Sequence, residues 1–217
     1  MQQTSQAQRT RDEYLAALLE PDPFRAREVA RRAVDGGLSL HELYTEVFQP
    51  VMIEVGDRWE AGTLSVAHEH LASEVTMSLI SEVAEHARRG PEGGRLAIVA
   101  CSPGERHCMG GKMLSILLEA SGWEVLYLGA TVPLEDIVSL ADSEVPDVVA
   151  LSTTMAANLP HVRETVPALH DLPEPPLVAL GGQAYRDEQQ ARALGADVWA
   201  PTAAAASRLL DEEVRPA

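Results

Sequence analysis

Aromatic and basic residues are scarce in this sequence. Its 217 residues include three Trp, four Tyr and two Phe, and 17 Lys or Arg stand against 33 Asp or Glu, for a formal net charge of −16. Lysine occurs once, as Lys112, so no basic stripe offsets a negative charge that repels nucleic-acid phosphates. We therefore expect no direct binding to DNA, and each Trp needs a structural or functional reason.

Long apolar runs, a secretory leader and a disulfide framework are also missing. No apolar run approaches the roughly 18 to 20 residues that span a bilayer, and the first residues lack the apolar segment of a signal peptide. The two cysteines, Cys101 and Cys108, are typical of reduced cytosolic thiols. With 46% hydrophobic residues the chain is too apolar for a disordered protein. The composition predicts a folded, soluble, cytoplasmic protein without a membrane partner.

Helix signals repeat through residues 1–90. Asp22, Ser39 and Ser65 are N-cap residues that each precede a stretch with helical periodicity. The predicted helices cover residues 11–19, 23–35, 40–60 and 66–89, and Pro50 predicts a kink in the third. Four helices joined by short loops predict an antiparallel bundle, which ends at the glycine- and proline-rich segment 90–94.

Residues 91–217 alternate short apolar runs with helical segments. The predicted strands are 95–101, 124–128, 147–152, 177–182 and 197–200, and the predicted helices are 107–121, 133–143, 158–170, 186–194 and 202–213. This alternation predicts a parallel sheet with helices on both faces. The fold class is therefore α plus α/β: an N-terminal four-helix bundle followed by a flavodoxin-like, Rossmann-type domain with a five-stranded parallel sheet. Ligands of such sheets bind where the strand order reverses, which predicts a site at loops 102–107 and 152–158.

The loop after the first predicted strand combines a carboxylate with an imidazole. It contains Glu105, Arg106, His107 and Gly110. A metal-ligating histidine gains basicity and a fixed tautomer when a carboxylate accepts its other N–H, and Glu105 could serve His107 in this way. The glycine spacing matches neither a P-loop nor a Rossmann phosphate fingerprint. Considered alone, His107 could equally be a helix-terminal residue and Glu105 a solvated acid.

Hydroxyls and glycines follow two further predicted strands. Ser152 and Thr154 come after the third strand, and Gly181 and Gly182 come after the fourth. The hydroxyls could extend the carboxylate–imidazole relay or bind the edge of a ligand. The glycines leave a floor without side chains, on which a flat and bulky group could lie. Ordinary turns use the same residue types, but here all of them gather at one edge of the predicted sheet.

These segments resemble the cobalamin-binding domain family over roughly residues 93–217. The motifs Glu105-x-His107-x-x-Gly110, Ser152-x-Thr154 and Gly181-Gly182 stand in the order and spacing of that family. The resemblance implies that His107 is the lower axial ligand of cobalt, and that the dimethylbenzimidazole tail of cobalamin lies in a channel lined by the other two motifs. Methyl-transferring members generally have Asp where this chain has Glu105. A corrinoid methyl carrier of a methyltransferase system and a plain cobalamin-storage module are the alternatives that remain open.

A second pattern, in the predicted bundle, resembles the cobalamin-dependent photoreceptors of the CarH type. Nine residues separate Trp59 from the pair Glu69-His70, and Val66 lies among them. By themselves, Trp59 could plug the end of the bundle and His70 could be a core or surface histidine. The resemblance implies instead that Trp59, Val66, Glu69 and His70 enclose the upper, adenosyl ligand of adenosylcobalamin. Residues 1–90 would then cap the upper face of the cofactor that residues 91–217 bind.

The same resemblance implies a regulatory protein, not an enzyme. Light breaks the Co–C bond in these photoreceptors and changes their oligomeric or partner state, so we expect a homo-oligomer and a separate effector protein. The family often has a histidine directly after the Trp, where this chain has Glu60. Its members carry a DNA-binding winged helix, which we expect this chain to lack. The related photocobilins also hold a bilin, so biliverdin or another bilin is a candidate second chromophore.

Overall fold

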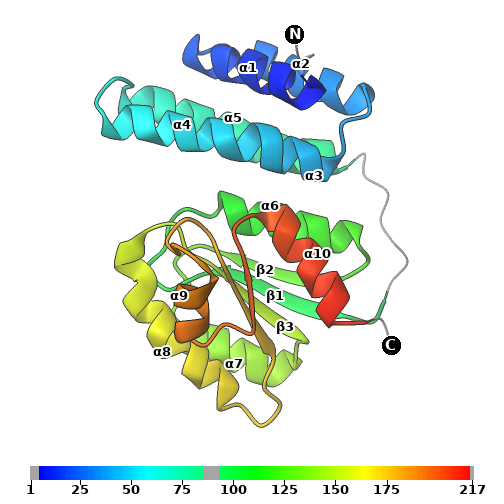
Figure 1. Ribbon diagram of the computed structural model, residues 1–217, viewed down its shortest axis with the longest axis vertical. Coiled ribbons are helices and arrows are strands. Elements are labelled where there is room, and N and C mark those ends of the chain that lie inside the picture. Colours follow the sequence, from blue (N-terminus) through cyan, green and yellow to red (C-terminus); the bar gives the residue numbers. More distant parts are fainter. Residues whose placement is uncertain (1–4, 86–92, 216–217) are drawn as a thin grey trace. The chain divides into compact units, whose positions relative to one another are not determined.

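The computed structural model describes residues 5–85 and 93–215. The chain divides into two compact units, Met1–Ala87 and Arg88–Ala217 (Figure 1). The predicted boundary at residues 90–94 and the end of the predicted helix 66–89 lie partly outside the described residues. Within the described ranges, no helix is both long enough and apolar enough to cross a membrane.

The first unit is built from helices that begin at the predicted caps. They are α1 (Gln6–Leu19), α2 (Pro23–Asp35), α3 (Leu40–Glu42), the π-helical segment η1 (Leu43–Phe48), α4 (Gln49–Glu60) and α5 (Val66–Ala84). Asp22 accepts the N–H of Arg25 at 3.0 Å, and Ser39 and Glu42 form a capping box. Helix α1 begins earlier than predicted because Ser5 caps it. Segments α3, η1 and α4 follow one another without a break, so they form the single predicted helix 40–60.

The π-helical segment lies directly before Pro50, where the sequence predicts a kink. Proline has no N–H, and its ring crowds the carbonyl four residues earlier in an α-helix. The N–H of Gln49 donates to the carbonyl of Tyr44, five residues earlier, which is the π-helical pattern. The helix therefore accommodates Pro50 by widening over the preceding turn.

Three of the scarce aromatic residues form the core of this unit. Tyr14, Tyr44 and Phe48 are buried, and the ring centroids of Tyr14 and Phe48 are 5.0 Å apart. Both buried hydroxyls are hydrogen-bonded to α5: Tyr14 to the hydroxyl of Thr76 at 2.9 Å, and Tyr44 to the carbonyl of Ile80 at 2.7 Å. These bonds satisfy polar groups that would be costly to bury alone, and they tie α5 to the other helices.

The second unit is a five-stranded parallel sheet with helices between the strands. The strands are β1 (Leu96–Cys101), β2 (Glu124–Gly129), β3 (Val148–Ser152), β4 (Leu177–Gly181) and β5 (Val198–Ala200), in the order β2-β1-β3-β4-β5. The helices are α6 (Met109–Ala120), α7 (Leu134–Glu144), the short 3-10 turn η2 (Ala156–Asn158), α8 (Leu159–His170), α9 (Glu188–Ala193) and α10 (Ala203–Glu213). All neighbouring strands are parallel. The predicted fold class is confirmed.

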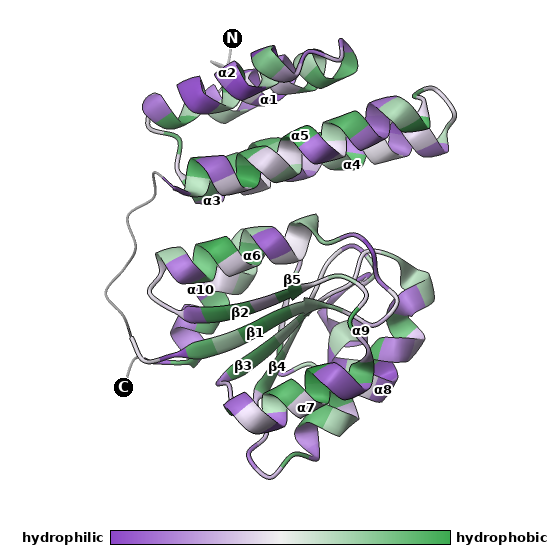
Figure 2. Cartoon of the chain, turned by 180° about the vertical axis from the view of Figure 1, so that it is seen from behind, coloured by the Kyte–Doolittle hydropathy of each residue, from purple (hydrophilic) through white to green (hydrophobic). Residues whose placement is uncertain are grey.

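Helices cover both faces of the sheet, as the apolar runs predict. Helices α6 and α10 lie on one face, and α7, α8 and α9 lie on the other (Figure 1). Ile98 packs toward the second group and its neighbour Val99 toward the first, and both are fully buried. Figure 2 shows the strands as hydrophobic segments between these layers. A strand buried on both faces has no polar side, which explains the uninterrupted apolar runs.

The strand order reverses at β1, which lies between β2 and β3. At the carboxyl edge Cys101 pairs with Ser152, and Ser152 pairs with Gly181. The loops after β1, β3 and β4 therefore start side by side. This brings together the three segments that carry the predicted motifs.

Candidate functional site

Glu105 lies at the centre of the loop after β1 and is completely buried. Its Oε1 accepts the backbone N–H groups of Arg106 and His107, both at 2.9 Å. The same oxygen lies 2.6 Å from Nδ1 of His107. The predicted carboxylate–imidazole pair is therefore present in the structure. Arg106 contributes its backbone, and its side chain is exposed.

The second carboxylate oxygen of Glu105 binds the segment that follows β3. Its Oε2 accepts the N–H groups of Thr154 and Met155 at 2.9 and 2.8 Å, and the side-chain amide of Asn158 at 3.0 Å. The sequence predicts that hydroxyls could extend the relay here. The structure instead places N–H donors on the carboxylate, and Thr154 contributes through its backbone.

These donors keep the buried carboxylate ionised. Burial raises the pKa of Glu105, but the hydrogen bonds from His107, Met155 and Asn158 outweigh that effect and lower the pKa to about 2. An ionised carboxylate can only accept hydrogen bonds, so Nδ1 of His107 is the donor in this contact. In the neutral imidazole, Nε2 is then the nitrogen with the lone pair. The side chain of His107 is 58% exposed. An exposed imidazole with a fixed tautomer is suited to ligate a metal through Nε2.

Neighbouring segments hold the loop that carries this pair. His161, on α8, donates from Nδ1 to the carbonyl of Pro103 at 2.7 Å. Gly104 has φ +82°, and a Cβ there would lie 3.1 Å from Asn158 and 3.2 Å from His161. Glycine is therefore needed both for the backbone conformation and for the close approach to α8. The N–H of Thr131 donates to the carbonyl of Glu105 at 3.3 Å.

Buried hydroxyls connect the strand ends beneath this loop. Thr153 donates to Ser102 at 3.0 Å and lies 3.0 Å from the hydroxyl of Tyr185. All three residues are buried. Ser152, one of the predicted hydroxyl residues, is half-buried and therefore more exposed than Thr153. A Cβ on Gly110 would lie 3.4 Å from the Oγ of Ser152. Ser152 and Gly110 thus lie beside the histidine loop, while Thr153 belongs to its internal support.

The glycine pair after β4 has a structural reason within the chain. Gly182 has φ +108°, and a Cβ there would lie 2.2 Å from the carbonyl oxygen of Thr153. A Cβ on Gly181 would lie 3.0 Å from the carbonyl oxygen of Ala200. Packing of the backbone therefore requires both glycines. Their predicted second role, as a floor beneath a flat ligand, stays a prediction.

The other predicted site residues lie in the first unit, around the turn from α4 to α5. Trp59 is 49% exposed and Val66 is 52% exposed, so Trp59 does not plug the core of this unit. The side chain of His70 is 74% exposed, with Nε2 3.6 Å from Oε2 of Glu69. Oε1 of Glu69 accepts the hydroxyl of Ser73 at 2.7 Å. Two apolar side chains and an imidazole thus face solvent at one end of this unit.

Sequence reasoning overlooked several residues of the histidine loop's support. They are Ser102, Met155, Asn158, His161 and Tyr185. Most of them lie in or beside the predicted site loops 102–107 and 152–158. Their position in these loops was the one feature of the sequence that could have pointed to them. The sequence did not indicate that the side-chain amide of Asn158, four residues after Thr154, bonds Glu105.

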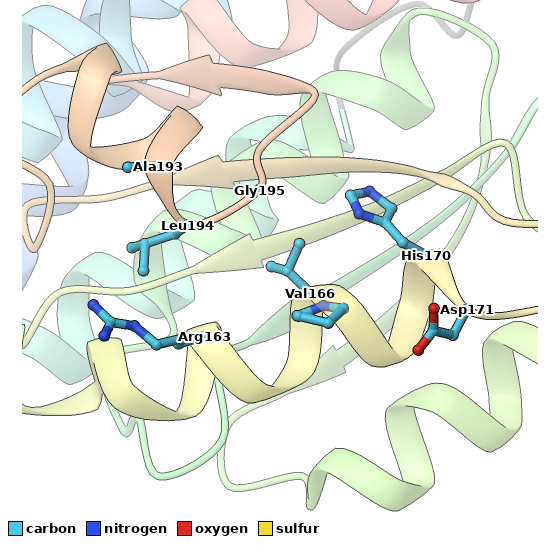
Figure 3. A pocket seen from close by; sticks show the side chains of 8 residues that line it. Arg163, Val166, His170, Asp171, Ala193, Leu194 and Gly195 are labelled. Atoms are coloured by element: carbon cyan, nitrogen blue, oxygen red, sulfur yellow. The ribbon is translucent and has the colours of Figure 1, made fainter.

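The donor set fits a metal that brings most of its own ligands. In the described ranges 5–85 and 93–215, no group of three or more His, Cys, Asp or Glu residues could hold a metal ion. One exposed imidazole, oriented by a carboxylate, would suffice for a metal whose other ligands come from its own cofactor. A separate open hollow, lined by Arg163, Val166, His170, Leu194 and Gly195 among others, contains none of the predicted site residues (Figure 3).

The fold and this histidine loop together define a flavodoxin-like domain with a carboxylate-oriented imidazole at the carboxyl edge of its sheet. Residues 95–210 match the family model described as B12 binding domain, and residues 10–83 match a second model with the same description. The chain belongs to the B12-binding domain family and is a cobalamin-binding protein. This confirms the resemblance of residues 93–217 to the cobalamin-binding domain family.

Similar proteins fall into two groups. The chain is 33% identical to the HTH-type transcriptional repressor CarH of Myxococcus xanthus over 84% of its own length and 60% of that repressor's. It is 27% identical to dimethylamine corrinoid protein 3 of Methanosarcina mazei, over 71% of this chain and 95% of that one. The Methanosarcina barkeri monomethylamine corrinoid protein has the same fold, with a TM-score of 0.81 at 21% identity over 95% of this chain and 99% of that one.

Proposed function

We propose that this protein is a light sensor that uses adenosylcobalamin, and that it is not itself an enzyme. The observation that carries the proposal is the exposure of Trp59 and Val66 beside Glu69 and His70 at the start of α5. Contiguous exposed apolar surface marks interaction sites, whereas single exposed apolar residues are ordinary, so the exposure supports the proposal only together with the spacing of these residues. Their spacing resembles the CarH-type photoreceptors, and the chain is similar in sequence to the CarH repressor.

His107 would hold the cofactor from below through Nε2. Glu105 keeps the proton on Nδ1, and the backbone around Glu105 fixes the carboxylate. Ser152, Thr154, Gly181 and Gly182 would line the channel for the cofactor's nucleotide tail. Cobalamin supplies a cobalt–carbon bond that visible light breaks, and the protein supplies the binding, the orientation and the response.

The residues of the first unit would cover the upper ligand. Trp59 and Val66 offer apolar surface to the adenosyl group, and Glu69 offers carboxylate oxygens to its hydroxyls. His70 would complete this cover. If the adenosyl group were lost, these side chains would lose the surface on which they pack, and the helical unit would change its contacts with a second copy or with an effector protein.

Illumination of the reconstituted protein tests this proposal. Protein loaded with adenosylcobalamin in darkness should change its absorption spectrum and its elution volume in gel filtration after green light. A matched sample loaded with hydroxocobalamin, which has no cobalt–carbon bond, should change neither. Identical spectra and elution volumes before and after light would contradict the light-sensor function.

A corrinoid methyl carrier is the second candidate, and the likeness to the di- and trimethylamine corrinoid proteins favours it. Such a carrier must leave the upper face accessible to partner enzymes. It would function with methylcobalamin, transfer the methyl group to a thiol acceptor with a cognate methyltransferase, and remain indifferent to light. These results together would show a methyl carrier and would contradict the light-sensor function.

Two further components of the proposal need their own measurements. A bilin, if bound, adds a red-absorbing chromophore to the corrinoid spectrum and a corresponding mass to the extracted cofactors. Homo-oligomer formation in the dark is measured by light scattering of the loaded protein. A sample without bilin absorption would limit the chromophore to cobalamin.

A further inference from the structure

Asn158 occupies the N-cap position of α8 but does not cap the helix. Asn at this position commonly accepts a hydrogen bond from the first helical turn. Here no side-chain cap bond is formed, and Nδ2 donates instead to Oε2 of Glu105 at 3.0 Å. The side chain thus stabilises the histidine loop in place of its own helix.

Asn158 differs from the other donors to Glu105. The remaining contacts come from backbone N–H groups and from His107 itself. Within the described residues, Asn158 is therefore the side chain other than His107 that hydrogen-bonds this carboxylate. Its own N–H donates to the carbonyl of Met155 at 2.9 Å. This bond closes the turn whose N–H groups also bind Oε2.

The loop before Glu105 also packs against Asn158. A Cβ on Gly104 would lie 3.1 Å from Oδ1 of Asn158. The amide group is consequently confined between Gly104 on one side and the carboxylate on the other. The confined amide of Asn158 fixes the orientation of the Glu105 carboxylate. The carboxylate in turn fixes the orientation of the His107 imidazole.

We propose that Asn158 is a positioning residue that fixes the carboxylate of Glu105 and, through it, the tautomer and ring orientation of His107. This inference rests on the proposed role of His107 as the lower ligand of cobalt. Partners of metal-ligating histidines typically contribute a factor of 10 to 100 to metal affinity. Loss of the Asn158 donor should therefore weaken cobalamin binding without removing the ligand.

Two substitutions separate positioning from structural effects. Asn158→Asp keeps the shape of the side chain but replaces the donor by a charge that repels Glu105. Asn158→Ser keeps a good N-cap residue but is too short to reach the carboxylate. Arg163→Ala is the control, since Arg163 is an exposed residue of the same helix α8, and its loss leaves every donor to Glu105 in place.

The measurements are cobalamin affinity, the electron paramagnetic resonance of the bound Co(II) form, and the tautomer of His107 in the cofactor-free protein by ¹⁵N NMR. Both Asn158 variants should raise the dissociation constant about ten-fold or more, with the larger effect for Asn158→Asp. They should also diminish the splitting from an axial nitrogen and reduce the fraction of the Nδ1–H tautomer. Arg163→Ala should stay within about three-fold of the parent protein.

The outcomes distinguish this inference from the proposed function. If both Asn158 variants match the parent in affinity, splitting and tautomer while His107→Ala loses the splitting, Asn158 has no positioning role and His107 remains the ligand. If His107→Ala itself leaves affinity and splitting unchanged, the axial-ligand assignment is wrong. If Asn158→Ser matches the parent and only Asn158→Asp is impaired, charge repulsion explains the effect and the inference is overturned.

Discussion

Replacing Glu105 by Gln should destabilise the second unit strongly at neutral pH. The carboxylate is completely buried, and each of its oxygens accepts three hydrogen bonds. The amide of Gln has one oxygen and one NH2 group. Whichever way it is oriented, the NH2 group would face three N–H donors that now bind a carboxylate oxygen. Because no part of the side chain is exposed, water cannot replace the missing acceptor.

The magnitude follows from the pKa of Glu105. The hydrogen bonds lower this pKa from the usual 4.5 to about 2 despite burial, which corresponds to about 3 kcal/mol of stabilisation. Donors left without an acceptor cost about 1 to 3 kcal/mol each. We therefore expect Glu105→Gln to reduce the free energy of unfolding by about 3 to 5 kcal/mol at pH 7.

The effect should depend on pH in a defined direction. A pKa that is lower in the folded state stabilises the protein above the unfolded-state value of 4.5, and this stabilisation is lost as the pH falls toward 2. The difference between the parent and Glu105→Gln should be constant above pH 5.5. Below pH 4.5 it should shrink by about 1.4 kcal/mol per pH unit.

Tryptophan fluorescence can report on the second unit alone. Trp123 and Trp199 lie in this unit and Trp59 lies in the other, so urea unfolding is measured in a Trp59→Phe background between pH 3.5 and 7. Glu188→Gln is the control, because Glu188 is exposed and pairs with Arg192 on the surface. Such pairs contribute at most about 1 kcal/mol. A difference below 1 kcal/mol for Glu105→Gln at pH 7, or one that does not vary with pH, would refute the reasoning.

Three further predictions address other parts of the chain. Burial raises the pKa of the Cys101 thiol to about 12, so Cys101 should not react with a disulfide reagent at pH 8 in the folded protein. The reagent should then modify Cys108 alone in the folded protein and both cysteines in guanidinium. Rapid modification of both cysteines in the folded protein would contradict this. Gly182→Ala should lower the free energy of urea unfolding by about 2 kcal/mol or more, since its Cβ would lie 2.2 Å from the carbonyl of Thr153. Gly56→Ala is its control, with no atom within 4 Å of the added Cβ in α4, and should be neutral or stabilising by up to about 1 kcal/mol. Trp59→Ala should change the free energy of unfolding by less than about 1 kcal/mol, because Trp59 is half-exposed. In binding titrations the same substitution should weaken the affinity for adenosylcobalamin more than the affinity for hydroxocobalamin. Equal effects on both affinities would exclude contact between Trp59 and the upper ligand.

The sequence predicts the sheet well because burial on both faces leaves a clear pattern. Runs such as the one around Ile98 and Val99 lack a polar side, and each is followed by a helix-forming segment. Parallel strands joined by helices then allow few strand orders. The position of the site at the carboxyl ends of β1 and β3 follows from that topology, without knowledge of any side-chain contact.

The partners of Glu105 could not be predicted in the same way. A backbone N–H of Thr154 or Met155 is present whatever the side chain, and only the loop conformation directs it to the carboxylate. Asn158 is only the first residue of the predicted helix 158–170, and the sequence does not indicate which group its side chain bonds. Its actual bond joins segments about fifty residues apart. Such contacts depend on three-dimensional loop geometry, which hydrophobic periodicity does not encode.

The two candidate functions differ at the upper ligand, not at the histidine loop. Both would require a fixed imidazole as the lower ligand, and the network around Glu105 would supply it whatever the upper ligand is. The discriminating residues are therefore those around the turn from α4 to α5. Trp59 and Val66 expose apolar surface that is costly in water. A methyl carrier gains nothing from bulky groups over a face that partner enzymes must reach, whereas a sensor needs an apolar cover that packs on the adenosyl group and is released when that group leaves.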